Sequence, residues 1–101
     1  MVKGTVINIA KRYIKELPNE IDVKKAYLFG SHAKGRHSEE SDIDIAIIIG
    51  TQKDIFEVQM QLLRLRREID LRIEPHPIRE EDFSTLNPFA DEIMQSGFEL
   101  V

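Results

Sequence analysis

The chain has 101 residues, of which 42% are hydrophobic and 32% are charged, and its formal net charge is −4. This length suits one folded domain over residues 1–101, and the composition argues against a disordered chain. The negative net charge disfavours a protein that binds nucleic acids mainly by charge. The chain has no cysteine, which excludes disulfides and thiolate metal sites, and no apolar run is long enough to span a membrane. We therefore expect a cytoplasmic protein with no direct nucleic-acid partner and no membrane partner.

The first predicted elements are one helix and two strands. Apolar residues from Val6 to Leu17 recur at steps of three and four, which predicts an amphipathic helix that ends at Pro18-Asn19. The apolar runs 26–30 (AYLFG) and 42–49 (DIDIAIII) predict strands. The polar segment 31–41 between them predicts a loop.

The second half of the chain continues this alternation of helices and strands. Residues 51–54 (TQKD) resemble a capping box, and they begin a predicted helix that runs from about residue 52 to about residue 68. Residues 69–74 alternate strictly between apolar and polar, which predicts a strand that Pro75 ends. Asn87-Pro88 predicts the start of a last helix, Gly97 its end, and residues 98–101 (FELV) a last strand.

The predicted order α-β-β-α-β-α-β indicates an α/β (α+β mixed) fold, in which helices pack on a small mixed sheet. We expect the first two strands to pair antiparallel across their loop. The helix over residues 52–68 is long enough for a right-handed crossover, which would make the third strand parallel to the second.

Two aspartates begin the otherwise aliphatic second strand. Asp42 and Asp44 point to the same face, and their Cα atoms lie about 6.6 Å apart. Carboxylates held this close repel each other unless a cation lies between them. Mg²⁺ takes one or two carboxylates together with waters and phosphate oxygens, and in two-metal sites the ions lie about 3.5–4 Å apart. The pair therefore predicts a magnesium site.

A phosphate-binding turn precedes the aspartates. Gly30 lacks a Cβ atom, so an oxyanion can approach the backbone, and Ser31 adds a hydroxyl and an amide. Antiparallel pairing would place this turn beside Asp42 and Asp44. We expect a third carboxylate at the start of the neighbouring strand, with Asp70 as first choice. Glu74 lies on the same face about 13 Å further along and is the second choice.

These motifs together resemble a known signature. Gly30-Ser31, ten residues and then Asp42-Ile43-Asp44 are similar to the motif of the nucleotidyltransferase superfamily that includes DNA polymerase beta. Ala33, Gly35 and Ser41 also match the wording of its minimal nucleotidyltransferase branch, as do segments 69–77 and 87–100. The resemblance covers nearly the whole chain and implies the polymerase beta-like fold.

The resemblance also implies the role of each site residue, and two Mg²⁺ ions with ATP as substrate. Lys34 stands where many members carry arginine, which keeps the charge but loses bidentate phosphate geometry. The implied residues are the phosphate-binding Gly30, Ser31 and Lys34 and the catalytic, metal-binding Asp42, Asp44 and Asp70, with Glu74 as alternative third acid.

The implied reaction is in-line attack by a hydroxyl on the α-phosphate of a nucleoside triphosphate. In the family, the partner is typically a small helical HEPN toxin, and the transferase can neutralise it by transferring AMP from ATP to one of its tyrosines. The resemblance therefore implies an antitoxin that works within a homo- or hetero-oligomer. Two alternatives stay open: a binding module that neutralises a toxin by contact alone, and an enzyme that nucleotidylates a small molecule.

The histidines offer a further candidate metal site. His32 and His37 fall in the polar loop, and His76 lies between two prolines. We interpret all three as surface or nucleotide-adjacent residues rather than as ligands of a transition metal.

Overall fold

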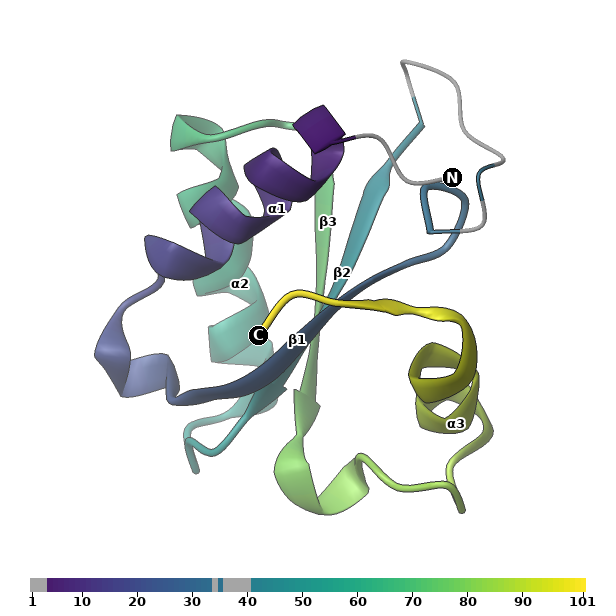
Figure 1. Ribbon diagram of the computed structural model, residues 1–101. Helices are drawn as coiled ribbons and strands as arrows, with labels where there is room; N and C mark the ends of the chain where they lie inside the picture. Colours follow the sequence, from purple (N-terminus) through teal and green to yellow (C-terminus); the bar gives the residue numbers. More distant parts are fainter. Residues whose placement is uncertain (1–3, 34, 36–40) are drawn as a thin grey trace.

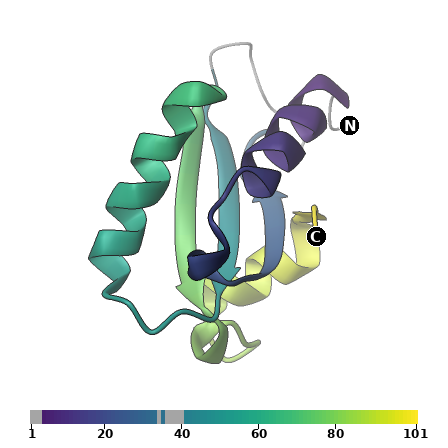
Figure 2. The same ribbon diagram turned by 90° about the vertical axis from the view of Figure 1, so that its left-hand side faces the viewer.

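The computed structural model describes residues 4–33, 35 and 41–101, and it shows a four-stranded sheet with helices on both faces (Figures 1 and 2). Helices α1 and α2 cover one face, and α3 lies against the other. The elements are α1 (Gly4–Lys15), β1 (Val23–Phe29), β2 (Ile43–Ile49), α2 (Ile55–Leu65), β3 (Ile73–Arg79), α3 (Pro88–Ser96) and β4 (Phe98–Glu99).

The strands are arranged in the order β3-β2-β1-β4. Strand β1 pairs antiparallel with both β2 and β4, and β2 pairs parallel with β3. The parallel pair is joined through α2, as a crossover requires. The predicted mixed sheet, the antiparallel first pair and the parallel crossover pair are all confirmed.

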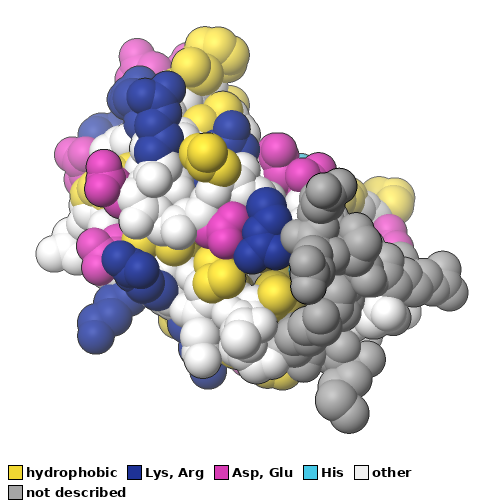
Figure 3. Space-filling view, turned by 90° about the horizontal axis from the view of Figure 1, so that it is seen from above, with side chains coloured by type: hydrophobic (Ala, Val, Ile, Leu, Met, Phe, Trp, Pro, Cys, Tyr) yellow, Lys and Arg dark blue, Asp and Glu magenta, His cyan; other side chains and the backbone are white. Residues whose placement is uncertain are grey.

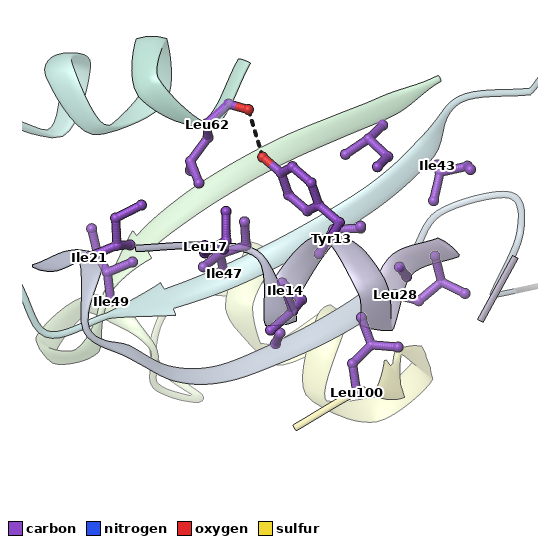
Figure 4. Packing of buried hydrophobic residues seen from close by; sticks show 14 of the residues in the cluster. Tyr13, Ile14, Leu17, Ile21, Leu28, Ile43, Ile47, Ile49, Leu62 and Leu100 are labelled. Carbon is purple, nitrogen blue, oxygen red and sulfur yellow. Dashed lines mark hydrogen bonds between the residues drawn. The ribbon is translucent and has the colours of Figure 1, made fainter. Parts of the chain in front are cut away.

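The larger core lies between the sheet and helices α1 and α2. Alternate residues of β2 (Ile43, Ile45, Ile47 and Ile49) point into it and are almost fully buried, as the period of two in a strand predicts. Figure 4 shows Tyr13 of α1 reaching across this core, where its hydroxyl donates a 2.7 Å hydrogen bond to the carbonyl oxygen of Leu62. Burial raises the pKa of Tyr13 well above its ordinary value.

Side-chain caps determine where two of the helices begin. The Asp54 carboxylate accepts hydrogen bonds from the amides of Phe56 and Glu57, so α2 begins at Ile55, later than the predicted start near residue 52. Asn87 caps α3 in the same way and is followed by Pro88 at the first helical position, as predicted.

Strand β3 differs from its prediction. It covers Ile73–Arg79, not residues 69–74, and it contains Pro75 instead of ending there. The reason is its place at the edge of the sheet. The Ile43 amide donates to the Arg72 carbonyl oxygen at 2.8 Å, so even-numbered backbone groups of β3 face β2, and prolines at odd positions interrupt no ladder hydrogen bond.

The outward edge of β3 is covered by side chains from the α2 side. Gln59 donates a hydrogen bond to the Pro75 carbonyl oxygen at 3.0 Å, and Arg66 donates one to the Ile73 carbonyl oxygen at 2.9 Å. These bonds occupy carbonyl groups that would otherwise be available to another strand.

The described surface mixes charges of both signs. Figure 3 shows acidic and basic side chains interspersed over the described part of the face seen from above Figure 1. In the ranges 4–33, 35 and 41–101, no helix combines the length and the apolar character that crossing a membrane requires.

Candidate active site

Asp44 occupies the centre of the candidate site. It is the second residue of β2, and the sheet register places it opposite Phe29 of β1 on one side and Glu74 of β3 on the other. Its side chain is 26% exposed and points to the α3 face, opposite to the large core. Asp42 lies just before β2, is exposed, and continues the same alternation, so the two carboxylates belong to one side of the sheet.

The Gly30 turn lies directly against Asp44. Gly30 has a φ of +75°, and a Cβ atom added to it would clash with Oδ2 of Asp44. Both the backbone conformation and the contact therefore require glycine. Ser31 follows in the same turn and is half-buried, whereas Lys34 lies outside the described residues. The structure thus brings together the predicted phosphate turn and one of the predicted metal ligands.

His32 holds the two ends of the loop close to each other. Of the two predicted positions, surface or nucleotide-adjacent, its burial excludes the surface one, and its Nε2 donates to the carbonyl oxygen of Ser41 at 3.2 Å. This contact joins the residue after the Gly30-Ser31 turn to the residue before Asp42. His37 falls outside the described part of the chain.

The two candidates for the third carboxylate lie in different surroundings. Asp70 is in the turn before β3, where Oδ1 accepts from the Arg72 amide at 2.8 Å and Oδ2 from its guanidinium at 2.9 Å. The side-chain hydrogen bonds from Arg72 hold the pKa of Asp70 below its ordinary value, although partial burial opposes this. Glu74 is the residue in register with Asp44, and its Oε1 lies 3.6 Å from Nη1 of Arg66.

His76, which was interpreted as a surface or nucleotide-adjacent residue, lies beside Asp44. Its Nε2 donates to Oδ1 of Asp44 at 3.2 Å, so one carboxylate oxygen faces His76 while the other faces Gly30. The signal that could have identified His76 is its spacing of two from Glu74, which puts both side chains on one face of β3. The edge position of β3 made this spacing difficult to recognise, because Pro75 suggested that the strand had ended.

The residues present fit a magnesium ion. Within residues 4–33, 35 and 41–101, no three His, Asp or Glu side chains come together as a complete protein-only metal site. Mg²⁺ does not need one, because it commonly takes one or two carboxylates and completes its shell with water and substrate phosphates. Asp42 and Asp44 supply such oxygens, and the missing Cβ of Gly30 lets Oδ2 of Asp44 lie directly against the Gly30 turn.

The chain is similar to known proteins over most of its length. Residues 11–100 match the family model described as Polymerase beta, Nucleotidyltransferase. "Putative protein adenylyltransferase MJ0141" of Methanocaldococcus jannaschii is 30% identical over 100 residues, which cover 94% of this chain and 98% of that protein. "Putative protein adenylyltransferase MJ0435" of the same organism is 38% identical over 64 residues, which cover 63% of this chain and 64% of that protein.

Solved structures share the fold. A toxin–antitoxin crystal structure with AMP-PNP superposes with a TM-score of 0.67 at 23% identity, and the match covers 94% of this chain and 72% of that one. The family model and the full-length relative confirm what the motif Gly30-Ser31 and Asp42-Ile43-Asp44 predicted, a minimal nucleotidyltransferase. The chain belongs to the polymerase beta nucleotidyltransferase family.

Proposed function

We propose that the chain transfers AMP from ATP to a hydroxyl of a partner protein, a tyrosine of a HEPN-type toxin, and so acts as its antitoxin. The observation that carries this proposal is the position of Asp44, which lies between the Gly30 turn and Glu74 on one face of the sheet. Two relatives named as protein adenylyltransferases and a toxin–antitoxin neighbour with AMP-PNP support the reaction, the partner and the nucleotide.

In this proposal the phosphates of ATP lie at the Gly30-Ser31 turn, where amide groups and the Ser31 hydroxyl face them. Asp42 and Asp44 would hold magnesium, which neutralises negative charge on the transferred and leaving phosphates. The acceptor oxygen forms the new bond to the α-phosphorus while the bond to pyrophosphate breaks. The proton of the acceptor hydroxyl passes to a carboxylate on β3.

We assign that carboxylate to Glu74 rather than to Asp70. Both oxygens of Asp70 already accept hydrogen bonds from Arg72, which leaves this carboxylate less available to a hydroxyl. Glu74 lies in register with Asp44, and its Oε1 lies 3.6 Å from Nη1 of Arg66, a looser contact than those of Asp70. Removing each carboxylate in turn distinguishes the two candidates.

Neutralisation by contact alone is the second candidate function. Large apolar side chains lie exposed on α2 and on the loops around β3, and a partner protein could cover them. These side chains are Phe56, Leu71 and Leu86. If the chain neutralised the toxin by contact alone, Asp42 and Asp44 would not be needed for neutralisation. Variants of these two residues therefore separate the two functions.

The deciding experiment follows radiolabel from α-³²P-ATP in the presence of Mg²⁺ and the candidate toxin. The wild-type protein should label the toxin and restore growth of cells that express it. The double variant Asp42→Asn/Asp44→Asn should do neither, while Asp82→Asn, an exposed aspartate beyond the far end of β3, should behave as wild type. Full neutralisation by the double variant without any labelling would replace the transferase proposal with the contact module.

A further inference from the structure

A cavity adjoins the Gly30 turn on the side of α3. It has a volume of about 170 Å³ and lies between the end of β1 and the helix. Its lining residues are Phe29, Gly30, Phe89, Glu92, Ile93 and Ser96. Gly30 therefore borders two features, because it lines this cavity and also lies against Oδ2 of Asp44.

Aromatic rings form one side of this cavity. Phe89, in the first turn of α3, meets Phe29 edge to face, with ring centroids 5.5 Å apart and planes at 81°. The ring of His76 lies 6.3 Å from that of Phe89 and 5.0 Å from that of Phe29. These contacts hold the Phe89 ring in place, although the residue remains 44% exposed. An exposed aromatic ring of this kind offers a surface on which a nucleobase can stack.

The helix wall adds polar groups at helical spacing. Glu92 and Ser96 follow Phe89 by three and seven residues, so all three lie on the same face of α3. The Ser96 hydroxyl donates to the Glu92 carbonyl oxygen at 2.9 Å. The Glu92 carboxylate can accept hydrogen bonds, which suits a base that carries an amino group rather than a carbonyl at that position.

We propose that this cavity binds the base of the nucleotide, an amino-bearing purine such as adenine, stacked on Phe89 and recognised by Glu92. This base site rests on the proposed nucleotide site, because phosphates held at Gly30-Ser31 place the rest of the nucleotide next to the cavity that Gly30 also lines. It goes beyond that proposal by giving the nucleobase a position and two residues that select it.

The test separates base binding from phosphate binding. The binding of Mg-ATP and of inorganic tripolyphosphate with Mg²⁺ is measured by calorimetry for the wild type and for Phe89→Ala. We expect the Kd for ATP to rise about tenfold, which is typical of a lost aromatic stacking partner, while that for tripolyphosphate stays unchanged. Phe89→Tyr should restore ATP binding. Phe56→Ala, which removes an exposed phenylalanine from α2, should alter neither Kd.

Other results would overturn the inference in distinguishable ways. Unchanged ATP binding by Phe89→Ala, with or without slower transfer, would show that the base lies elsewhere while leaving the proposed function intact. An equal rise of the Kd values for both ligands would show that the substitution disturbs the whole site instead of removing one base contact. Failure of the wild type to bind either ligand would overturn the base site together with the proposed function.

Glu92 has a test of its own. The wild type should bind ATP more tightly than ITP, whose base carries a carbonyl in place of the amino group. Glu92→Gln should reduce this preference about tenfold, because an amide can donate to the carbonyl of hypoxanthine. An unchanged ratio of the two Kd values in Glu92→Gln would remove Glu92 from the proposed site.

Discussion

The two faces of β2 show how one strand serves two purposes. Toward α1 and α2 it presents four isoleucines at alternate positions, each almost fully buried. Toward α3 it presents Asp44, Ala46 and Ile48, which change from polar to apolar along the strand. One face is uniform over its whole length, whereas the other opens to solvent at the end where Gly30 and Glu74 lie.

The two faces of β2 separate the residues that stabilise the fold from those of the candidate site. The isoleucine face gains its free energy from apolar area removed from water, and no residue of the candidate site contributes to it. The carboxylate face keeps acidic groups close together, which costs electrostatic free energy without a cation. Substitutions on the first face should therefore change unfolding, and those on the second should change transfer.

The largest expected effect is on the buried face. Ile47→Ala removes a fully buried side chain and leaves a cavity, which should lower the free energy of unfolding by about 2–5 kcal/mol. Ile47→Val removes a single methylene and should cost only about 0.5–1.5 kcal/mol. Urea unfolding followed by circular dichroism measures both. Equal losses for the two variants would contradict the cavity explanation.

The next effect belongs to the opposite face. Glu74→Gln should reduce the rate of transfer about 100-fold or more, because it removes the carboxylate that we propose as the acceptor of the hydroxyl proton. Its free energy of unfolding should stay close to that of the wild type. The matched variant Asp70→Asn should keep nearly the wild-type rate in the same labelling assay. The reverse order of the two rates would give the catalytic role to Asp70.

A smaller effect on stability is expected from the Tyr13 hydroxyl, a polar group buried in the larger core. Tyr13→Phe removes the hydroxyl that donates to the buried carbonyl oxygen of Leu62. This should cost about 0.5–1.5 kcal/mol, because the same oxygen still accepts from the Arg66 amide. The pKa of Tyr13 is raised by burial, so the wild type should lose stability as the pH rises above about 10, where the unfolded chain ionises first. Tyr13→Phe should lose this part of the alkaline pH dependence, which unfolding curves at pH 8–11 would reveal.

The smallest effect concerns the turn before β3. The pKa of Asp70 is lowered in the folded protein, so its ion pair with Arg72 stabilises the fold above about pH 4 and is lost as the pH falls through the lowered pKa. Asp70→Asn should lower stability near neutral pH by less than about 1 kcal/mol, as for partly exposed pairs. Thermal midpoints at pH 7 and pH 2 would test this, since the variant and the wild type should differ only at the higher pH.

Local sequence patterns determined most of the fold and the centre of the site. The three helices, β1, β2 and the helix start at Asn87-Pro88 follow from the spacing of apolar residues and from caps, which act over a few residues. The motif Gly30-Ser31 and Asp42-Ile43-Asp44 predicted the family that the match over residues 11–100 confirms.

The tertiary structure alone decided which residues meet across the sheet. Pro75 ends a central strand but is tolerated at an edge, and whether β3 lies at an edge depends on the whole sheet. The extent of β3 fixes the register that puts Glu74 opposite Asp44, and a parallel pair joined through a helix has no turn sequence to specify that register. For the same reason, two contacts could not be predicted from the sequence, because they depend on how the strands and α3 pack. These are the contacts of His76 with Asp44 and of Phe89 with Phe29.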